Sequence, residues 1–170
     1  HKDLANDQYL RLDTTASVLT TSTRFQSLDP TASIIYVGSD SAVSGDGDGE
    51  AIIAYCWHGV EGYSKIGSYE GNGNADGPFV YLGFKPAFVM TKSVDGTENW
   101  AINDNKRSPV NPVDKFLRAD EASVESSSAA KMDFLSNGFK IRTNDTKINA
   151  SHTFIYMAFA EMPFKYANAR

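Results

Sequence analysis

The stretch FVYLGFKPAFVMTKSV, residues 79–94, decides the fold. It consists of short runs of aromatic and β-branched residues with Gly and Pro at their ends, a composition typical of β-strands joined by turns. A second run of this kind, HTFIYMAFAEM, occupies residues 152–162. Both runs are therefore predicted to be strands.

Working outward, seven further segments have the same character. They are QYLRLD (8–13), SIIYVGS (33–39), EAIIAYCW (50–57), YSKIGSYE (63–70), NWAIND (99–104), KFLRAD (115–120) and GFKIRT (138–143). The Ser-rich stretch at 122–132 lacks a sustained 3.6-residue stripe and is predicted to be a loop or a single turn. About nine short strands without intervening long helices predict an all-β fold, an antiparallel β-sandwich of the jelly-roll or lectin-like kind.

Alternation along these strands predicts a core, because every second residue of a half-buried strand shares one face. The residues expected to be mostly buried are Ile53, Tyr55, Trp57, Phe79, Phe88, Met90, Phe116, Phe139, Ile141, Ile155, Met157 and Phe159. Truncation of Phe159 to Ala is accordingly expected to cost roughly 3 to 5 kcal/mol.

An internal repeat is predicted from two similar segments, DQYLRLD at 7–13 and DKFLRAD at 114–120. Each is followed by a Ser/Thr/Ala-rich stretch, an apolar strand and then an aromatic strand. We expect residues 1–60 to be the second half of a first, truncated repeat and residues 61–170 to be a complete second one. Either the missing half lay upstream in a longer polypeptide, which we favour, or the early strands complete the later sheet.

Composition and charge exclude several classes of protein. The net charge of the 170 residues is −5, and no basic cluster exceeds Lys106 and Arg107, so nucleic acid is not an expected partner. The apolar stretches are far shorter than the roughly 20 residues that span a bilayer, so membrane insertion is not expected either. Cys56 lies within the apolar run AIIAYCW and is predicted to be a small buried thiol.

No pattern in the chain predicts catalysis, a metal or a cofactor. Its 21 acidic residues make candidate carboxylate pairs too common to be informative. His58 and His152 have no neighbours at metal-ligand spacing. The acidic run GDGDGE at 45–50 is predicted to be a solvated hairpin loop rather than a calcium site. We therefore expect a protein that is not an enzyme.

Two regions are candidate ligand-binding sites. The first is the loop GNGNADG at 71–77, whose side chains can bond sugar hydroxyls or bridge their own backbone; its candidate residues are Asn72, Asn74 and Asp76. The second is ENWAINDNKR, where an exposed indole beside polar groups would stack on a sugar, although alternation equally allows a core position. Its candidate residues are Trp100, Asn103 and Arg107.

The chain resembles a β-rich domain that recurs near the C-termini of phage tail-fibre-like proteins, abundant among phages of marine bacteria. The motifs that carry the resemblance are GSYEGNGNADGPFVYLGFKPAFV, the NW…D…R group with its SP, and the ending FAEMPF. The resemblance covers residues 52–170 strongly and residues 7–51 more weakly, through the repeat. It implies a component of the virion surface, extracellular when it functions.

The resemblance and the residues together leave three functions open. We rank first a non-enzymatic module of a tail fibre or related appendage that recognises bacterial surface glycan. A purely structural or decorative module that packs against other virion proteins ranks second, and a polysaccharide depolymerase third. The resemblance also implies a homotrimer, which would let several weak sites act together.

Overall fold

The structure is a computed structural model that describes residues 1–45, 51–127 and 129–162. These residues form two compact units. The first contains the described residues within His1–Leu10 and Val18–Trp57, and the second contains those within Arg11–Ser17 and His58–Arg170. Each unit is described separately below.

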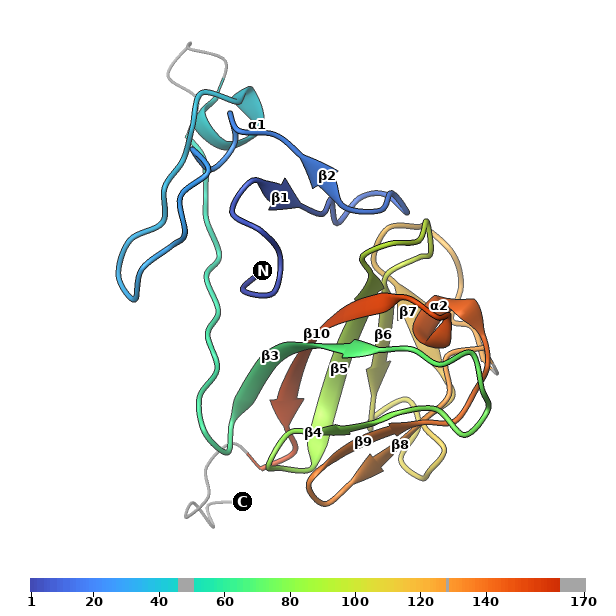
Figure 1. Cartoon of the computed structure of the whole chain (residues 1–170). Coiled ribbons are helices and arrows are strands. Elements are labelled where there is room, and N and C mark those ends of the chain that lie inside the picture. The colour runs from blue at the N-terminus through green and yellow to red at the C-terminus, as the bar shows by residue number, and fades with distance from the viewer. Residues whose placement is uncertain (46–50, 128, 163–170) are drawn as a thin grey trace. The chain divides into compact units, whose positions relative to one another are not determined.

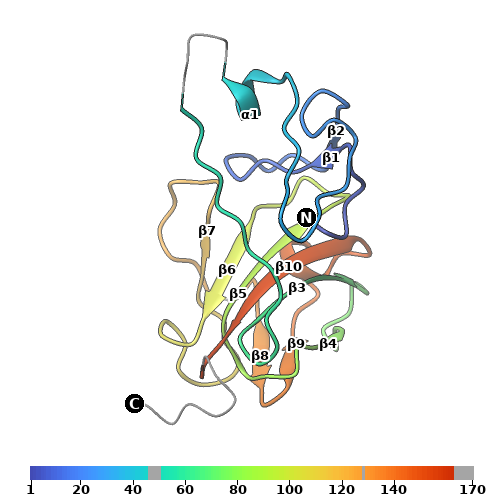
Figure 2. The ribbon, with the colours of Figure 1, turned by 90° about the vertical axis from the view of Figure 1, so that its left-hand side faces the viewer.

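The second unit is an antiparallel sandwich of two sheets (Figure 1). Figure 2 shows the larger sheet in its order β3-β10-β5-β6-β7. Its strands are β3 (Ser64–Glu70), β10 (Thr153–Ala160), β5 (Pro86–Ser93), β6 (Ala101–Asp104) and β7 (Phe116–Arg118). The smaller sheet has the order β4-β9-β8, with β4 (Phe79–Tyr81), β9 (Gly138–Ile141) and β8 (Met132–Leu135). The predicted all-β antiparallel sandwich is confirmed.

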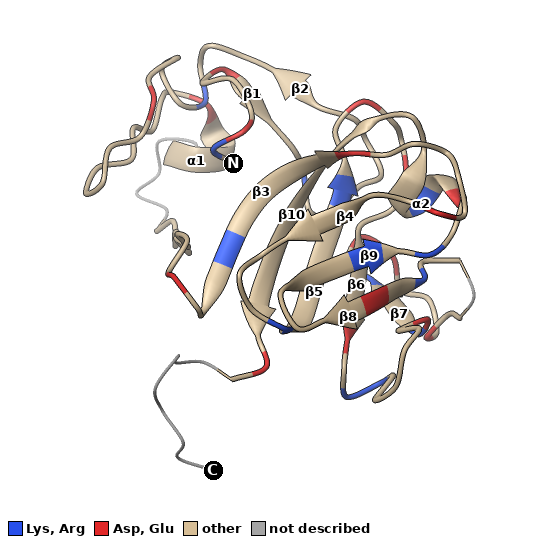
Figure 3. Ribbon diagram, turned by 60° about the horizontal axis from the view of Figure 1, so that its bottom comes forward, with Lys and Arg blue, Asp and Glu red and all other residues tan. Residues whose placement is uncertain are grey.

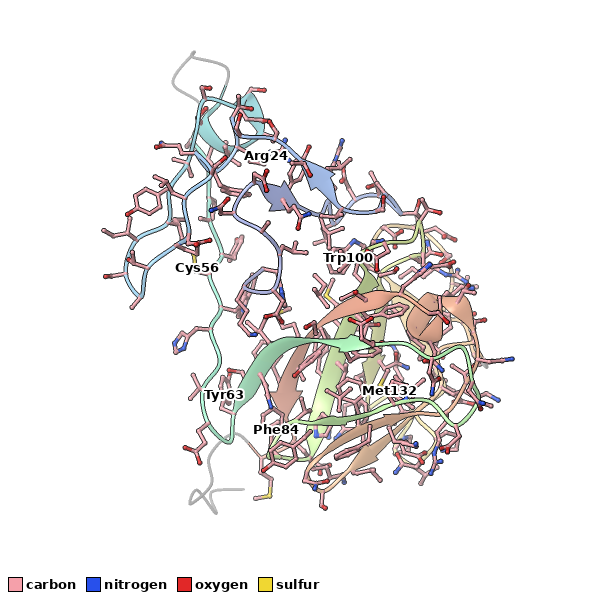
Figure 4. All side chains as sticks on the ribbon, in the orientation of Figure 1. Arg24, Cys56, Tyr63, Phe84, Trp100 and Met132 are labelled. Atoms are coloured by element: carbon pink, nitrogen blue, oxygen red, sulfur yellow. The ribbon has the colours of Figure 1, made fainter. Side chains whose placement is uncertain are left out.

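The core of the second unit lies between the two sheets. Phe139 of β9 makes edge-on contacts with Tyr69 of β3, at 6.0 Å between ring centroids, and with Tyr156 of β10, at 5.6 Å. Tyr69 in turn stacks on Phe154 at 5.2 Å. Met132 of β8, labelled in Figure 4, is fully buried and belongs to the same core. Aromatic pairs of this kind add about 0.5 to 1.5 kcal/mol each beyond the area they bury, so this cluster holds the two sheets together.

Of the residues predicted to form the core of the sandwich, four are buried, and four others are only half-buried. The four that are buried are Phe116, Phe139, Ile141 and Ile155. The four that are only half-buried are Phe88, Met90, Met157 and Phe159. The core face of β10 is carried instead by Phe154, Tyr156 and Ala158. Both faces of β10 are apolar, so alternation alone does not decide which one points inward.

The first unit contains little regular structure among its described residues. Strands β1 (Gln8–Tyr9) and β2 (Leu19–Thr20) pair with each other, and α1 (Ser41–Ser44) is a single turn. Arg24 pairs with Asp40 at 3.1 Å, and its guanidinium lies 3.8 Å from the centre of the Tyr9 ring. None of the described residues of this unit is buried.

The strands predicted at 33–39 and 50–57 are wrong in the described part of these segments, because neither forms a strand. Ile53, Tyr55 and Trp57 were predicted to be buried, but they are 75%, 74% and 55% exposed. The Cys56 thiol is also exposed. A strand needs partners for its backbone N–H and C=O groups, and propensity alone does not supply them.

The structure does not show the predicted internal repeat. β7, from the second copy, pairs with β6 at the edge of the five-stranded sheet. Its counterpart in the first copy contributes only β1, which pairs with β2 in a separate two-stranded sheet. The acidic run at 46–50 lies outside the described residues.

Candidate functional site on the outer face of the smaller sheet

Two aromatic side chains are exposed on the outer face of the three-stranded sheet. Val80 points into the core, so its neighbours on β4, Phe79 and Tyr81, point outward and are 44% and 59% exposed. The prediction that Phe79 is buried is therefore wrong, because it lies on the opposite face from Val80. Large apolar groups that lie together at the surface of a rigid element often mark an interaction site.

A glycine lets the Phe79 ring lie close to the backbone of β9. Gly138 of β9 pairs with Tyr81. A Cβ atom at Gly138 would lie only 3.1 Å from two carbons of the Phe79 ring and 2.1 Å from the backbone oxygen of Val80. No other residue fits at this position without displacing the ring or the strand. We call Phe79, Tyr81 and Gly138 the aromatic platform.

A network of alternating charges lies beside the aromatic platform. Lys140 is paired with Phe79 across β9 and β4, and its Nζ donates to Asp76 Oδ1 at 2.8 Å. Arg142 Nε donates to Asp133 Oδ2 at 2.5 Å, and its NH1 lies 3.8 Å from Asp76 Oδ1. Figure 3 shows the acidic residue of β8 beside the basic residue of β9. We call Asp76, Asp133, Lys140 and Arg142 the charge network.

The charge network favours the ionised forms of two of its members, Asp76 and Arg142. The hydrogen bond and charge of Lys140 keep the pKa of Asp76 below its usual value. The hydrogen bond and charge of Asp133 raise the pKa of Arg142. The Asp76 side chain is 77% exposed and that of Arg142 is 46% exposed. The face therefore presents fixed donors and acceptors next to two aromatic rings.

The Lys65 ammonium supports Tyr81 from the neighbouring sheet. Its Nζ donates to the backbone oxygen of Tyr81 at 2.7 Å and lies 5.2 Å from the centre of the Tyr81 ring. A cation near an aromatic ring is attracted to the electron-rich face of the ring. This contact ties β4, at the edge of its sheet, to β3.

The predicted loop at 71–77 contributes one residue to this face. The side-chain oxygens of Asn72 and Asn74 accept hydrogen bonds from the backbone N–H groups of Asn74 and Asp76, at 3.0 and 2.9 Å. The buried Asn149 of α2 (Thr146–Asn149) donates to the backbone oxygen of Asn74 at 2.6 Å. These amide groups fix the shape of the loop. Asp76 is the candidate residue of the loop that belongs to the charge network.

The three candidate residues around β6 do not gather at the aromatic platform. Trp100 is half-buried and its Nε1 donates to the backbone oxygen of Arg11 at 2.9 Å. Asn103 is fully buried and donates to the backbone oxygen of Ala130 at 2.8 Å, so its side chain is not available at the surface. Arg107, beyond the other end of the strand, pairs with Asp104 and with Glu125.

Sequence reasoning missed Phe79 as a surface residue, and it missed Tyr81, Lys140 and Arg142 altogether. The available signal was the alternation Phe-Val-Tyr on β4 together with Gly138 and Lys140 on β9. That signal becomes meaningful only when β4 and β9 are known to pair, which fixes their outward residues on one face.

The described residues also line a pocket of about 240 Å³ at the end of β5 and β6. Its walls include Lys85 and Asn105, which are both bonded to Glu161, at 2.8 and 2.9 Å. The side-chain oxygen of Asn105 is buried and has no hydrogen-bond partner among the described residues.

The described residues contain no group of three or more His, Cys, Asp and Glu that could hold a metal ion. In the same part of the chain, every helix is too short to cross a membrane.

Comparison with protein families finds a match to the model described as Domain of unknown function (DUF7483), over residues 1–163. No curated protein and no solved structure matches the chain.

Proposed function

We propose that this chain, which belongs to the DUF7483 family, is a non-enzymatic module that binds bacterial surface glycan. In this proposal it stands on the surface of a phage virion, in a tail fibre or related appendage, as a homotrimer beside other virion proteins. The aromatic platform with its adjoining charge network is the observation that supports glycan binding.

The chemistry of a sugar fits this face. A pyranose ring has an apolar C–H face and a rim of hydroxyl groups, so it stacks on an aromatic ring while its rim forms hydrogen bonds. Phe79 and Tyr81 offer the stacking surface, and Asp76 and Arg142 offer an acceptor and a donor at its margin. Hydrogen bonds to charged groups are the stronger kind.

The same groups support binding rather than cleavage. A glycosidase needs one carboxylic acid that stays protonated near neutral pH, which requires a raised pKa. Here Arg142 lies close to both carboxylates of the face, Asp133 and Asp76, and the pKa of Asp76 is lowered. The Asp76 carboxylate is thus suited to accept hydrogen bonds from a bound sugar.

The test measures glycan binding by the wild-type chain and by platform variants. A glycan array of bacterial surface polysaccharides identifies the bound sugar, and titration then gives its affinity. Phe79→Ala and Tyr81→Ala are each expected to weaken binding by about fivefold or more, since an aromatic contact is worth about 1 kcal/mol. Val124→Ala serves as the control, because Val124 is 87% exposed but lies in the loop after β7.

Three results would contradict the proposal or a part of it. If no glycan on the array binds, or if both platform variants bind as well as the wild type, the face is not a glycan site. A structural role in the virion would then be favoured. Release of reducing ends from the bound polysaccharide would contradict the non-enzymatic part of the proposal.

A further inference from the structure

The charges around the aromatic platform do not balance. The charge network contains two carboxylates and two cations, which pair with one another. Lys65, whose ammonium lies beside Tyr81, adds a third cation. This part of the surface therefore has one positive charge in excess, although the net charge of the whole chain is −5.

Lys65 carries the excess charge, because the described residues offer its ammonium no carboxylate partner. Its Nζ donates to the backbone oxygen of Tyr81 at 2.7 Å and lies 5.2 Å from the centre of the Tyr81 ring. Both of these partners are neutral. An ammonium has three N–H donors, so the bond to Tyr81 leaves Lys65 with further donors for a ligand.

The two cations of the charge network are less available to a ligand, since each is bonded to a carboxylate. Lys140 Nζ donates to Asp76 Oδ1 at 2.8 Å and to a backbone oxygen at 2.7 Å. Arg142 Nε donates to Asp133 Oδ2 at 2.5 Å. An anion that approached these cations would have to compete with Asp76 and Asp133. At Lys65 it would meet no such competitor among the described residues.

Lys65 also lies where a substituent of a stacked sugar would reach. It belongs to β3, at the edge of the larger sheet, and Figure 3 shows it in blue as the basic residue of that strand. Its side chain extends from β3 to Tyr81 of β4, so its ammonium lies at the margin of the Tyr81 ring. A sugar that stacks on Tyr81 and extends beyond the ring toward β3 would therefore meet Lys65.

We infer that the sugar bound at the aromatic platform is a uronic acid, and that Lys65 determines this specificity by pairing with its carboxylate. The inference rests on the proposed glycan-binding function and names the class of glycan. The carboxylate of a uronic acid projects from the rim of the pyranose ring, so it can meet Lys65 while the C–H face stacks on Tyr81. The resulting hydrogen bond is charge-assisted and is therefore of the stronger kind.

The size of the excess charge favours a carboxylate over a phosphate. One positive charge matches the single negative charge of a carboxylate. A phosphate monoester carries about −1.5 to −2 at pH 7 and is better matched by several cations. Around the platform, the other two cations are already paired with Asp76 and Asp133.

The test compares acidic glycans with the same glycans after reduction of their carboxylates to primary alcohols. The probes are oligogalacturonate, oligoglucuronate and the glycans that the array identifies, each titrated into the full chain. The wild type is expected to bind the acidic member of a pair about threefold or more tightly, as a partly exposed ion pair allows. This preference should diminish as salt is added, because salt screens exposed charges.

Two variants of Lys65 separate its charge from its contact with β4. Lys65→Gln keeps an N–H donor for the Tyr81 oxygen but not the charge, so it is expected to lose the preference for the acidic member. Lys65→Arg keeps the charge and should keep the preference. Lys115→Gln is the control, because it removes the same charge beside β7, at the opposite edge of the larger sheet. A purely structural role of Lys65 would change both affinities alike and leave their ratio unchanged.

Failure of the inference can be distinguished from failure of the proposed function. If the bound glycans are neutral, or if acidic and reduced members bind equally, the inference is overturned while glycan binding stands. The same holds if Lys65→Gln keeps the preference of the wild type. If no glycan of either kind binds, the aromatic platform is not a glycan site and both proposals are wrong.

Discussion

At the scale of single residues, the two phenylalanines of β10 should contribute unequally to stability. Phe154 is fully buried and stacks on Tyr69, whereas Phe159 is half-buried on the opposite face. Phe154→Ala is expected to cost roughly 3 to 5 kcal/mol. The sequence alone predicts the same cost for Phe159→Ala, but the half-buried position of Phe159 in the structure predicts a clearly smaller one. Urea unfolding of both variants measures the difference, and equal losses would mean that the outer face of β10 is covered as well as the core.

Lys92 is an unusual residue because its side chain is fully buried without a carboxylate bonded to it. Its ammonium donates to the backbone oxygens of Ser93, Thr15 and Gly96, at 3.0, 3.2 and 3.3 Å. Removal of the charge from water lowers the pKa of Lys92, and the more distant charges of Asp120 and Glu98 oppose this effect only in part.

The lowered pKa of Lys92 predicts a dependence of stability on pH. Between its folded pKa and its ordinary value of about 10.4, the unfolded chain binds more protons at this site than the folded chain does. The free energy of unfolding should therefore rise with pH across this window. The measured quantity is the difference in free energy of unfolding between the wild type and Lys92→Met, which has no group to titrate at this position. Because the other titrating groups are shared, they cancel in the difference. A difference that stays constant with pH would contradict the prediction.

At the scale of elements, the sequence predicts strands well where runs of aromatic and β-branched residues end at turn residues, as in β5 and β10. It fails where the partner strand decides the outcome. β8 (Met132–Leu135) was not predicted, because it adjoins a Ser-rich stretch and becomes a strand through its pairing with β9. Residues 51–57 have strand propensity but no partner among the described residues.

The candidate site was only partly predictable for the same reason. Asp76 could be identified from its loop, because Gly, Asn and Asp side chains there suggest ligand contact. The outward direction of Phe79 depends on Val80 facing Phe139 and the rest of the core, a long-range contact that the local sequence does not contain. The alternation was visible in the sequence, but its direction was not.

At the scale of the whole molecule, the two units differ in what stabilises them. The second unit has its own core, in which Phe139, Phe154 and Tyr156 are buried. The first has none among its described residues. In the proposed homotrimer, each weak glycan site would become part of a multivalent surface. Linked weak sites can gain about a hundredfold or more in avidity without new contacts.

Hydrogen exchange should reveal this difference between the units. The amides of residues 51–57 should exchange at unprotected rates, because no backbone hydrogen bond between described residues involves them. The amides of β10, paired on both sides with β3 and β5, should open only with the whole sandwich. Mass spectrometry of peptides from the two segments measures the difference in exchange rate. Protection of residues 51–57 to the level of β10 would show that this segment is paired in solution and would contradict the prediction.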